Sequence, residues 1–417
     1  MFVQPLTRRM ALGRLGDGFA GLAIGSLMTS TTSADSPRTS LSQRSPRHRA
    51  PARAVIQLFM HGGPSHVDLL DPKPMLSRYH GTTPPAEVDD DEDRTKYLLG
   101  SPFSFRRYGE SGLEFSEVMS GVATHADDIA VVRSMFTEHR NHEQAIWMAN
   151  TGLIRPGRPN IGSWAAYGLG SETDDLPAYI ALPDPVGLPV DGVRNWSSGW
   201  LPPVYQGTAF RSQGVPVLHL KPSQSRTQAV SRGRLGFLQA LNRKHLRTRP
   251  GELELEARIA NFELAARMQL SATDALDLSS ETKATHEMYG LNNPTTKSYG
   301  RRCLMARRLI ERGVRFVQLF MKGQPWDTHT GNTNGLRSVC GQTDGPIGAL
   351  LTDLKRRGLF DSTLVQWGGE FGRTPGAELR DNNTTKGNEG RDHHPYGFSV
   401  WLAGGGIRGG QAYGATD

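Results

Sequence analysis

The order of apolar and polar positions predicts short buried strands separated by longer helices. Strand-length runs that are almost wholly apolar are typical of strands covered on both faces. Such runs occupy residues 55–60, 129–135, 314–321, 363–367 and 398–402. Apolar residues at helical spacing indicate helices over residues 252–270, 299–312 and 346–357. Because helices and strands alternate over residues 297–403, we expect an α/β fold with a mostly parallel central sheet and helices on both faces.

Residues 153–250 differ from the rest of the chain in composition. They are rich in Gly and Pro and hold only short strand-like pieces, at 179–182 and 215–220. We interpret them as an insertion that caps the sheet of one folded domain spanning residues 54–417.

The N-terminal segment has the features of an export signal. Arg8 and Arg9 have the twin-arginine form, and a small-residue apolar run follows at 18–28. That run is shorter than the roughly 20 residues that span a bilayer, and Thr32-Ser33-Ala34 fits a cleavage site. We therefore expect a signal peptide at 1–34, a flexible linker at 35–53 and a periplasmic or secreted protein with no integral membrane segment. An unstructured start with a chance Arg pair is the alternative.

The charge of the chain is concentrated in this leader. The formal net charge is +7, and residues 1–53 carry eight Arg and two Asp, which leaves about +1 for the remainder. This distribution argues against a nucleic-acid partner. Two cysteines, Cys303 and Cys340, are too few for a disulfide scaffold and are expected to be buried thiols. The acidic run at 87–93 is interpreted as a solvated loop, with a calcium site as the alternative.

Side chains of the metal-binding type follow or precede several of the predicted strands. Because ligands of parallel α/β sheets bind at the carboxyl ends of strands, such side chains can form one divalent-metal site. The candidates in the last hundred residues are Asp327, His329, Glu370, His393 and His394. Adjacent residues of an extended chain point in opposite directions, so only one of the two neighbouring histidines should face the site. Arg373 is expected either to pair with Glu370 or to bind an oxyanion.

The first predicted strand also ends in metal-type residues. His61 follows that strand directly, and Asp68 lies seven residues further on. Both are candidate metal ligands, and Asp68 is the preferred carboxylate. Carboxylate and imidazole together suit zinc, manganese or iron.

Several motifs together resemble a bacterial protein family. They are Gly62-Gly63-Pro64-Ser65-His66-Val67-Asp68, residues 258–268, Trp326-Asp327-Thr328-His329, residues 369–375, residues 390–395 and Gly404-Gly405-Gly406. With the leader, they resemble domain-of-unknown-function family 1501, twin-arginine-exported proteins abundant in planctomycetes. That family is similar to the sulfatase and alkaline phosphatase superfamily, which implies a metal site at the carboxyl edge of the sheet. Members of that family usually continue with a further helical segment, so the resemblance implies either a short version of the family or a chain whose C-terminus is truncated.

The resemblance fails at the nucleophile. In those enzymes a Ser, Cys or Thr lies nine residues before the Thr of a helical Thr-Gly pair, and here that position holds His142. His142 is therefore a candidate metal ligand, general base or nucleophile, and Glu143 is expected to orient it.

The leading hypothesis is an exported metal-dependent hydrolase of phosphate or sulfate esters. Its substrate would be a small-molecule or polysaccharide ester, and the resemblance favours sulfated polysaccharide. The ion would be zinc, manganese, iron or calcium, and Arg373 would stabilise oxyanion charge. A non-catalytic carbohydrate-binding or cell-surface protein on a degenerate hydrolase fold is the second hypothesis, and a metal-dependent isomerase or mutase is the third. The sequence predicts no oligomeric state.

Overall fold

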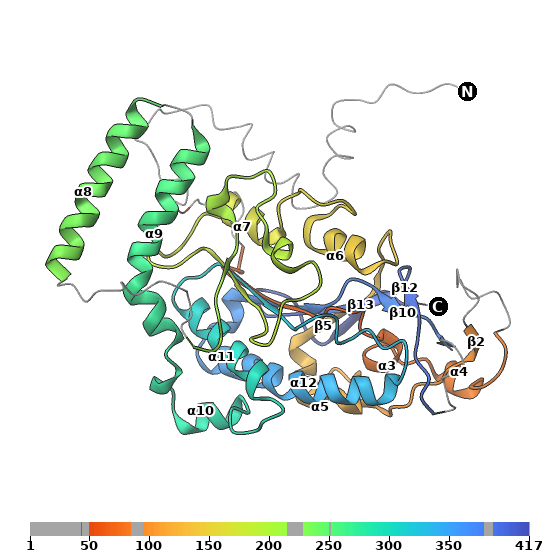
Figure 1. Ribbon diagram of the computed structural model, residues 1–417. Helices are drawn as coiled ribbons and strands as arrows, with labels where there is room; N and C mark the ends of the chain where they lie inside the picture. The colour runs from red at the N-terminus through yellow and green to blue at the C-terminus, as the bar shows by residue number, and fades with distance from the viewer. Residues whose placement is uncertain are drawn as a thin grey trace, which may run out of the picture.

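The computed structural model describes residues 43, 50–84, 95–214, 228–249, 252–378 and 387–416. Its centre is an eight-stranded sheet with strand order β14-β5-β13-β9-β1-β8-β6-β7 (Figure 1). The sheet strands are β1 Ala54–Phe59, β5 Ile129–Met135, β6 Tyr179–Leu182, β7 Thr208–Ala209, β8 Phe316–Phe320, β9 Thr363–Gly368, β13 Phe398–Ala403 and β14 Gln411–Tyr413.

The sheet is parallel except for one strand, which confirms the predicted mixed α/β architecture. β1 lies at its centre and pairs in parallel with β8 and β9. β13 runs antiparallel to both of its neighbours, β9 and β5. Two parallel strands can be joined only if the chain crosses back to the edge of the sheet where the first strand began, usually through a helix. The described residues between β9 and β13 contain no helix, so the chain returns from the same edge and β13 runs in reverse.

Helices cover both faces of the sheet, as predicted. Figure 1 shows α6 and α7 over one face and α5, α11 and α12 over the other. Their bounds are α5 Ser120–Ala123, α6 His142–Thr151, α7 Ile161–Leu169, α11 Lys297–Glu311 and α12 Asn332–Arg356. α12 begins 14 residues before the predicted start at 346 and includes Pro346 in its interior. Proline opposes an interior helical position, but Pro346 is buried where α12 packs against α5 and α11, and this packing outweighs the local preference.

The remaining elements lie around this three-layer body. The helices are α3 His66–Leu69, α4 Pro74–Arg78, α8 Gln228–Arg247, α9 Leu253–Leu276 and α10 Lys283–Met288. The short strands are β2 Thr95–Leu98, β3 Phe105–Tyr108, β4 Leu113–Ser116, β10 Gly372–Arg373, β11 Gly376–Glu378 and β12 His393–His394. β10 pairs with β12, which brings the segment after β9 against the segment before β13.

Part of the region that was predicted to cap the sheet belongs to the sheet itself. β6 pairs in parallel with β8, and β7 extends the same edge. The segments predicted at 1–34, 87–93 and 215–220 lie outside the described residues. Within the described part of the chain, no helix is both long and apolar enough to cross a membrane. Cys303 and Cys340 are free and buried, as predicted.

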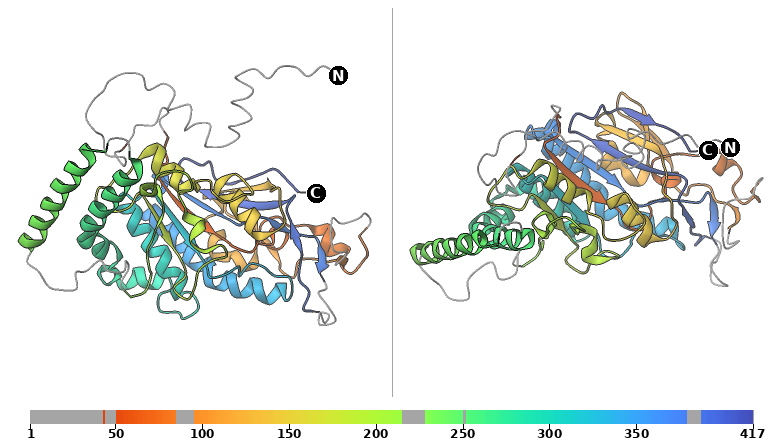
Figure 2. Two further views of the ribbon diagram at one scale, coloured as in Figure 1. Left: turned by 45° about the horizontal axis from the view of Figure 1, so that its top comes forward. Right: turned by 90° about the horizontal axis from the view of Figure 1, so that it is seen from above.

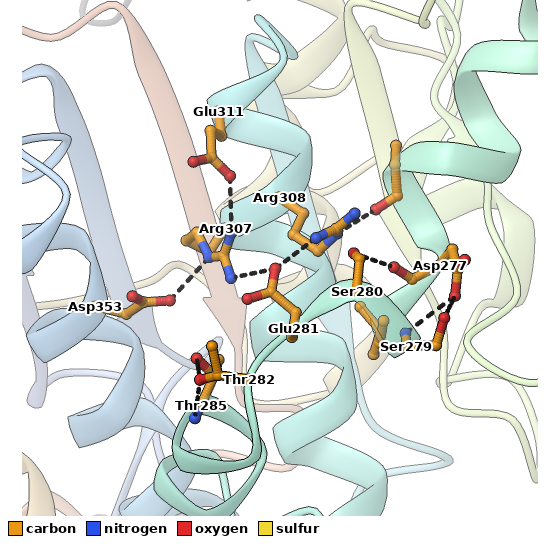
Figure 3. A network of polar contacts seen from close by, with 12 residues as sticks. Asp277, Ser279, Ser280, Glu281, Thr282, Thr285, Arg307, Arg308, Glu311 and Asp353 are labelled. Carbon is orange, nitrogen blue, oxygen red and sulfur yellow. Dashed lines mark hydrogen bonds and ion pairs between the residues drawn. The ribbon is translucent and has the colours of Figure 1, made fainter.

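A buried ion-pair network joins the helices beneath the sheet (Figure 3). Arg307 of α11 lies 2.7 Å from Glu281, 2.7 Å from Glu311 and 2.8 Å from Asp353 of α12. Arg307 is fully buried, so each carboxylate offsets part of the cost of removing its charge from water. The network fixes α11 against α12 on the face away from α6 and α7.

Candidate metal centre

Four side chains meet at the carboxyl edge of the parallel strands. His142 begins α6 after β5, whereas Asp327 and His329 follow β8. His393 precedes β13, and because β13 is antiparallel, its beginning lies at that same edge. His142, Asp327, His329 and His393 each offer one ligand atom, and these atoms all lie within 4.8 Å of one another.

Local structure fixes the positions of these residues. The Asn141 side chain caps α6 by accepting a hydrogen bond from the Glu143 N–H, which places His142 at the first helical position. Gly62 has φ +112°, and a Cβ there would lie 2.4 Å from the backbone nitrogen of Asp327. Only glycine lets the turn after β1 pack this closely against the turn that carries Asp327.

Asp327 is the centre of the cluster. Its Oδ1 lies 2.9 Å from His329 Nε2 and 3.2 Å from His393 Nε2. Its Oδ2 lies 3.3 Å from His142 Nε2. All three imidazoles therefore direct Nε2 toward one carboxylate.

The opposite nitrogen of each ring, Nδ1, faces a hydrogen-bond acceptor. The acceptors are Glu370 Oε1 for His142 at 2.6 Å, Glu378 Oε2 for His329 at 2.5 Å and the Arg140 carbonyl for His393 at 2.7 Å. An acceptor at Nδ1 favours the tautomer with its proton there, in which the Nε2 lone pair would point into the cluster. This tautomer is the one that binds a metal through Nε2.

The electrostatics of the cluster favour an anionic Asp327. Burial opposes its charged form, but contacts with the histidines and with Arg373 outweigh burial and lower the pKa of Asp327 well below its usual range. Burial also opposes the charged forms of His142 and His329, yet their carboxylate partners raise the pKa of both. Burial dominates at His393 and lowers its pKa to about 4.

The donor set fits a transition-metal ion. Each of the three rings has an acceptor near both of its nitrogens, and one divalent ion at the Nε2 atoms can take the place of protons there beside the Arg373 guanidinium. Three imidazoles and one carboxylate suit zinc, manganese or iron. The set does not fit calcium, which was among the expected ions, because calcium prefers six to eight oxygen ligands.

Arg373 occupies a supporting position rather than the expected oxyanion-binding one. Its Nε donates to the Gly63 carbonyl at 2.9 Å and its Nη1 to the Arg391 carbonyl at 3.0 Å. Its Nη2 donates to Asp327 Oδ1 at 2.6 Å and to the Gly62 carbonyl. The guanidinium is fully buried and its donors are directed at the protein, so Arg373 positions Asp327.

The structure does not bring Asp68 into the cluster. Arg391 contacts its carboxylate at 2.7 and 3.0 Å, and Ser65 and Asn332 also donate to it. The charged form of Asp68 is costly to bury, but the Arg391 guanidinium outweighs burial and lowers its pKa. The carboxylate that was preferred as a ligand is therefore used in a buried ion pair.

Glu370 and His61 are not among the four candidate ligands. Glu370 Oε1 accepts hydrogen bonds from His142 Nδ1 and, at 2.8 Å, from the Gly62 N–H. His61 packs between the rings of Phe59 and Phe320, and burial lowers its pKa to about 4. Both were candidate ligands, but the structure places them outside the group that meets at Asp327.

Two further expectations are resolved by side-chain direction. His394 faces away from the cluster and stacks on His66 at a centroid distance of 6.5 Å, whereas His393 faces inward. Only one of the adjacent pair enters the site, as predicted. Glu143 is exposed, and Glu370 makes the contact to His142 that was expected of Glu143.

The sequence analysis missed Glu378 and the Arg140 carbonyl. Glu378 is fully buried at the end of β11 and holds His329, yet it belongs to no motif and follows no sheet strand. A backbone carbonyl leaves no residue-type signal at all. Glu378 and Asp392 also form a second metal-type group that shares His329.

Fold and site together define an α/β protein with a three-histidine, one-aspartate candidate metal centre at the carboxyl edge of its sheet. The chain belongs to the family described as protein of unknown function (DUF1501), whose model matches residues 52–417. No curated protein matches it.

Solved structures with a similar course of the chain include two hydrolases and a synthase. A magnesium-bound variant of TAB5 alkaline phosphatase, from an Antarctic bacterium, is 13% identical, with 88% of this chain and 95% of that chain covered and a TM-score of 0.36. The lipoteichoic acid synthase LtaP from Listeria monocytogenes is 8% identical and has a TM-score of 0.36. The match covers 89% of this chain and 71% of that chain. The PsFucS1 sulfatase from Pseudoalteromonas sp. is 12% identical and has a TM-score of 0.33. The match covers 88% of this chain and 65% of that chain.

Proposed function

We propose that this protein is an exported metal-dependent hydrolase of phosphate or sulfate esters. The observation that carries the proposal is the orientation of three imidazoles, each with Nε2 toward Asp327 and Nδ1 on an acceptor. An arrangement that fixes three tautomers at once supports metal binding more strongly than it supports a structural hydrogen-bond network.

The residues divide into ligands and supports. His142, Asp327, His329 and His393 hold the ion, and a divalent ion so held supplies a Lewis acid that polarises an ester oxygen. The carboxylate of Glu370 favours a proton on His142 Nδ1, so that Nε2 is the nitrogen directed inward to a metal. The side chains of His393 and Asp327 remain 15% and 13% exposed, which leaves the cluster open to a substrate from solvent.

His142 is better suited to be a ligand than a nucleophile. Its Nδ1 lies 2.6 Å from Glu370, and its Nε2 lies among the other candidate ligand atoms. Neither nitrogen is left for attack on an ester, so we assign the attack to water. This choice accounts for the lack of a hydroxyl or thiol at the position that resembles the nucleophile of alkaline phosphatases and sulfatases.

The substrate class and the route of export are parts of the same proposal. The superfamily resemblance supports phosphate or sulfate esters, with sulfated polysaccharide as the proposed natural substrate.

The Arg8-Arg9 leader supports twin-arginine export. Cell fractionation of the Arg8→Lys, Arg9→Lys variant tests export, and retention of the variant in the cytoplasm is the expected result.

The activity is tested with metal-loaded protein on aryl phosphate, aryl sulfate and aryl phosphonate esters. We expect turnover of at least one ester class by the parent protein and by Glu143→Gln, whose side chain is exposed. Asp327→Asn should lose turnover because it removes the only carboxylate of the four-residue group. A parent protein that binds stoichiometric metal but cleaves none of these esters, and retains sulfated polysaccharide, would contradict the hydrolase and support the non-catalytic binding protein.

A further inference from the structure

A helical arm projects from the side of the molecule that lies farthest from the metal centre. It consists of α8 and α9, and Figures 1 and 2 show it standing out from the body at the end opposite β10 and β12. α9 is anchored through Leu264 and Met268, which belong to the buried core. None of the α8 residues whose side chains are described is buried. A 20-residue amphipathic helix gains most of its stability from packing, yet the contact of α8 with α9 buries none of the α8 side chains that are described.

The two helices of the arm leave an open apolar groove between them. The groove has a volume of about 570 Å³ and is lined by Leu241 of α8 and by Leu255, Ile259 and Phe262 of α9, among others. Phe262 is 64% exposed. Phe237, one turn before Leu241, is 66% exposed. Large side chains gathered in this way on a surface mark an interaction site rather than scattered exposure.

Each helix carries one stripe of apolar residues that are not buried in the core. Val230, Phe237 and Leu241 are separated by seven and four residues, which places them on one face of α8. The three α9 groove residues are separated by four and three residues, and their face is opposite to the one that Leu264 buries. Because Leu241 lines the same groove as the three α9 residues, the α8 stripe faces the α9 stripe across that groove.

The two helices carry opposite charge. Residues 228–249 contain five Arg, one Lys and no acid, whereas residues 252–276 contain four Glu, one Asp and two Arg. Helical spacing places Glu252, Glu256 and Glu263 along one edge of the α9 stripe. Arg234 and Lys244 border the α8 stripe, one on each side.

We propose that the arm binds the arm of a second copy of this chain, with α8 of each copy packed against α9 of the other. A twofold arrangement of this kind pairs the basic helix with the acidic helix twice and closes both grooves in a bundle of four helices. An anionic membrane suits α8 alone, because the acidic edge of α9 borders the same groove and would be repelled. The opposite charges of the two helices thus select a second copy as the occupant.

Sedimentation velocity of the full chain over a range of concentrations tests this dimer. The parent protein should dimerise, and Phe237→Glu should weaken dimerisation at least 10-fold because it places a carboxylate in the apolar bundle. Val186→Glu is the matched control, since Val186 is 71% exposed but lies outside the arm. It should dimerise as the parent does. A parent protein that stays monomeric at every concentration would overturn the proposal.

Charge reversal separates contacts between copies from contacts within one arm. The variants Arg234→Glu, Lys244→Glu and Glu256→Lys, Glu263→Lys should each lose dimerisation, because each gives the residues that border the α8 stripe and the α9 stripe the same sign of charge. An equimolar mixture of the two should regain it, since the residues bordering the α8 stripe of either variant then meet residues of opposite charge on α9 of the other. Circular dichroism confirms that the helices remain folded. A mixture that stays monomeric, or a monomeric parent that sediments with phosphatidylglycerol vesicles, would refute the two-copy arm.

Discussion

Replacement of Glu370 by Gln tests whether the residues behind the ligands tune the metal centre. Glu370 is fully buried, and its Oε1 accepts from His142 Nδ1 at 2.6 Å and from the Gly62 N–H at 2.8 Å. Gln keeps an acceptor oxygen but removes the negative charge that fixes the His142 proton at Nδ1. Loss of such a partner lowers metal affinity about 10- to 100-fold. That corresponds to about 1.4 to 2.8 kcal/mol of binding free energy.

The assay is competition for Zn²⁺ against a chromophoric chelator at fixed pH. Glu143→Gln is the matched control, because Glu143 neighbours His142 in sequence but its side chain is exposed. We expect the Glu370 variant to lose affinity and the Glu143 variant to keep that of the parent. Equal affinity for all three proteins, or a larger loss in the Glu143 variant, would refute the assignment of Glu370 as the residue that orients His142.

Three further predictions concern the surroundings of the site. Asp68→Asn should lower the free energy of unfolding by about 3–5 kcal/mol in urea titrations, because it leaves the buried Arg391 without its counter-charge, while folded protein keeps its metal. Gly62→Ala should cost most of the metal content measured by elemental mass spectrometry, since its Cβ would meet backbone at 2.4 Å at a φ of +112°. Zinc binding at pH 7 should release protons, measured by calorimetry in two buffers of different ionisation enthalpy. The carboxylate partners raise the pKa of His142 and His329 and so favour their protonated forms in the metal-free protein, which means that affinity should rise with pH.

The sequence predicted the sheet and the edge at which the site lies. Apolar runs identify buried strands, and the predicted strand at 129–135 matches β5 residue for residue. Polar residues placed just after those runs must lie at one edge of a parallel sheet, which is why Asp327 and His329 lie together in the cluster. The opposite directions of His393 and His394 followed from the two-residue period of an extended chain.

The partners of each charged side chain could not be predicted in the same way. Residue type makes Asp68 a good ligand, yet the fold brings Arg391 to it from 323 positions away. Arg373 carries the charge of an oxyanion binder but is surrounded by the carbonyls of a turn that follows β1. The spacing of residues along the chain predicts secondary structure. The partners of Asp68 and Arg373 depend instead on which loops meet at the edge of the sheet. The reversed direction of β13 depends on the same information.

The central claim is that His142, Asp327, His329 and His393 hold one divalent ion. Anomalous diffraction from crystals of zinc-loaded protein, recorded on both sides of the zinc absorption edge, tests it directly. We predict one strong peak about 2.0–2.2 Å from the Nε2 atoms of the three histidines and from an Asp327 oxygen. A peak on other residues, such as Glu370 or Asp68, or no peak from protein that contains stoichiometric zinc, would contradict the account.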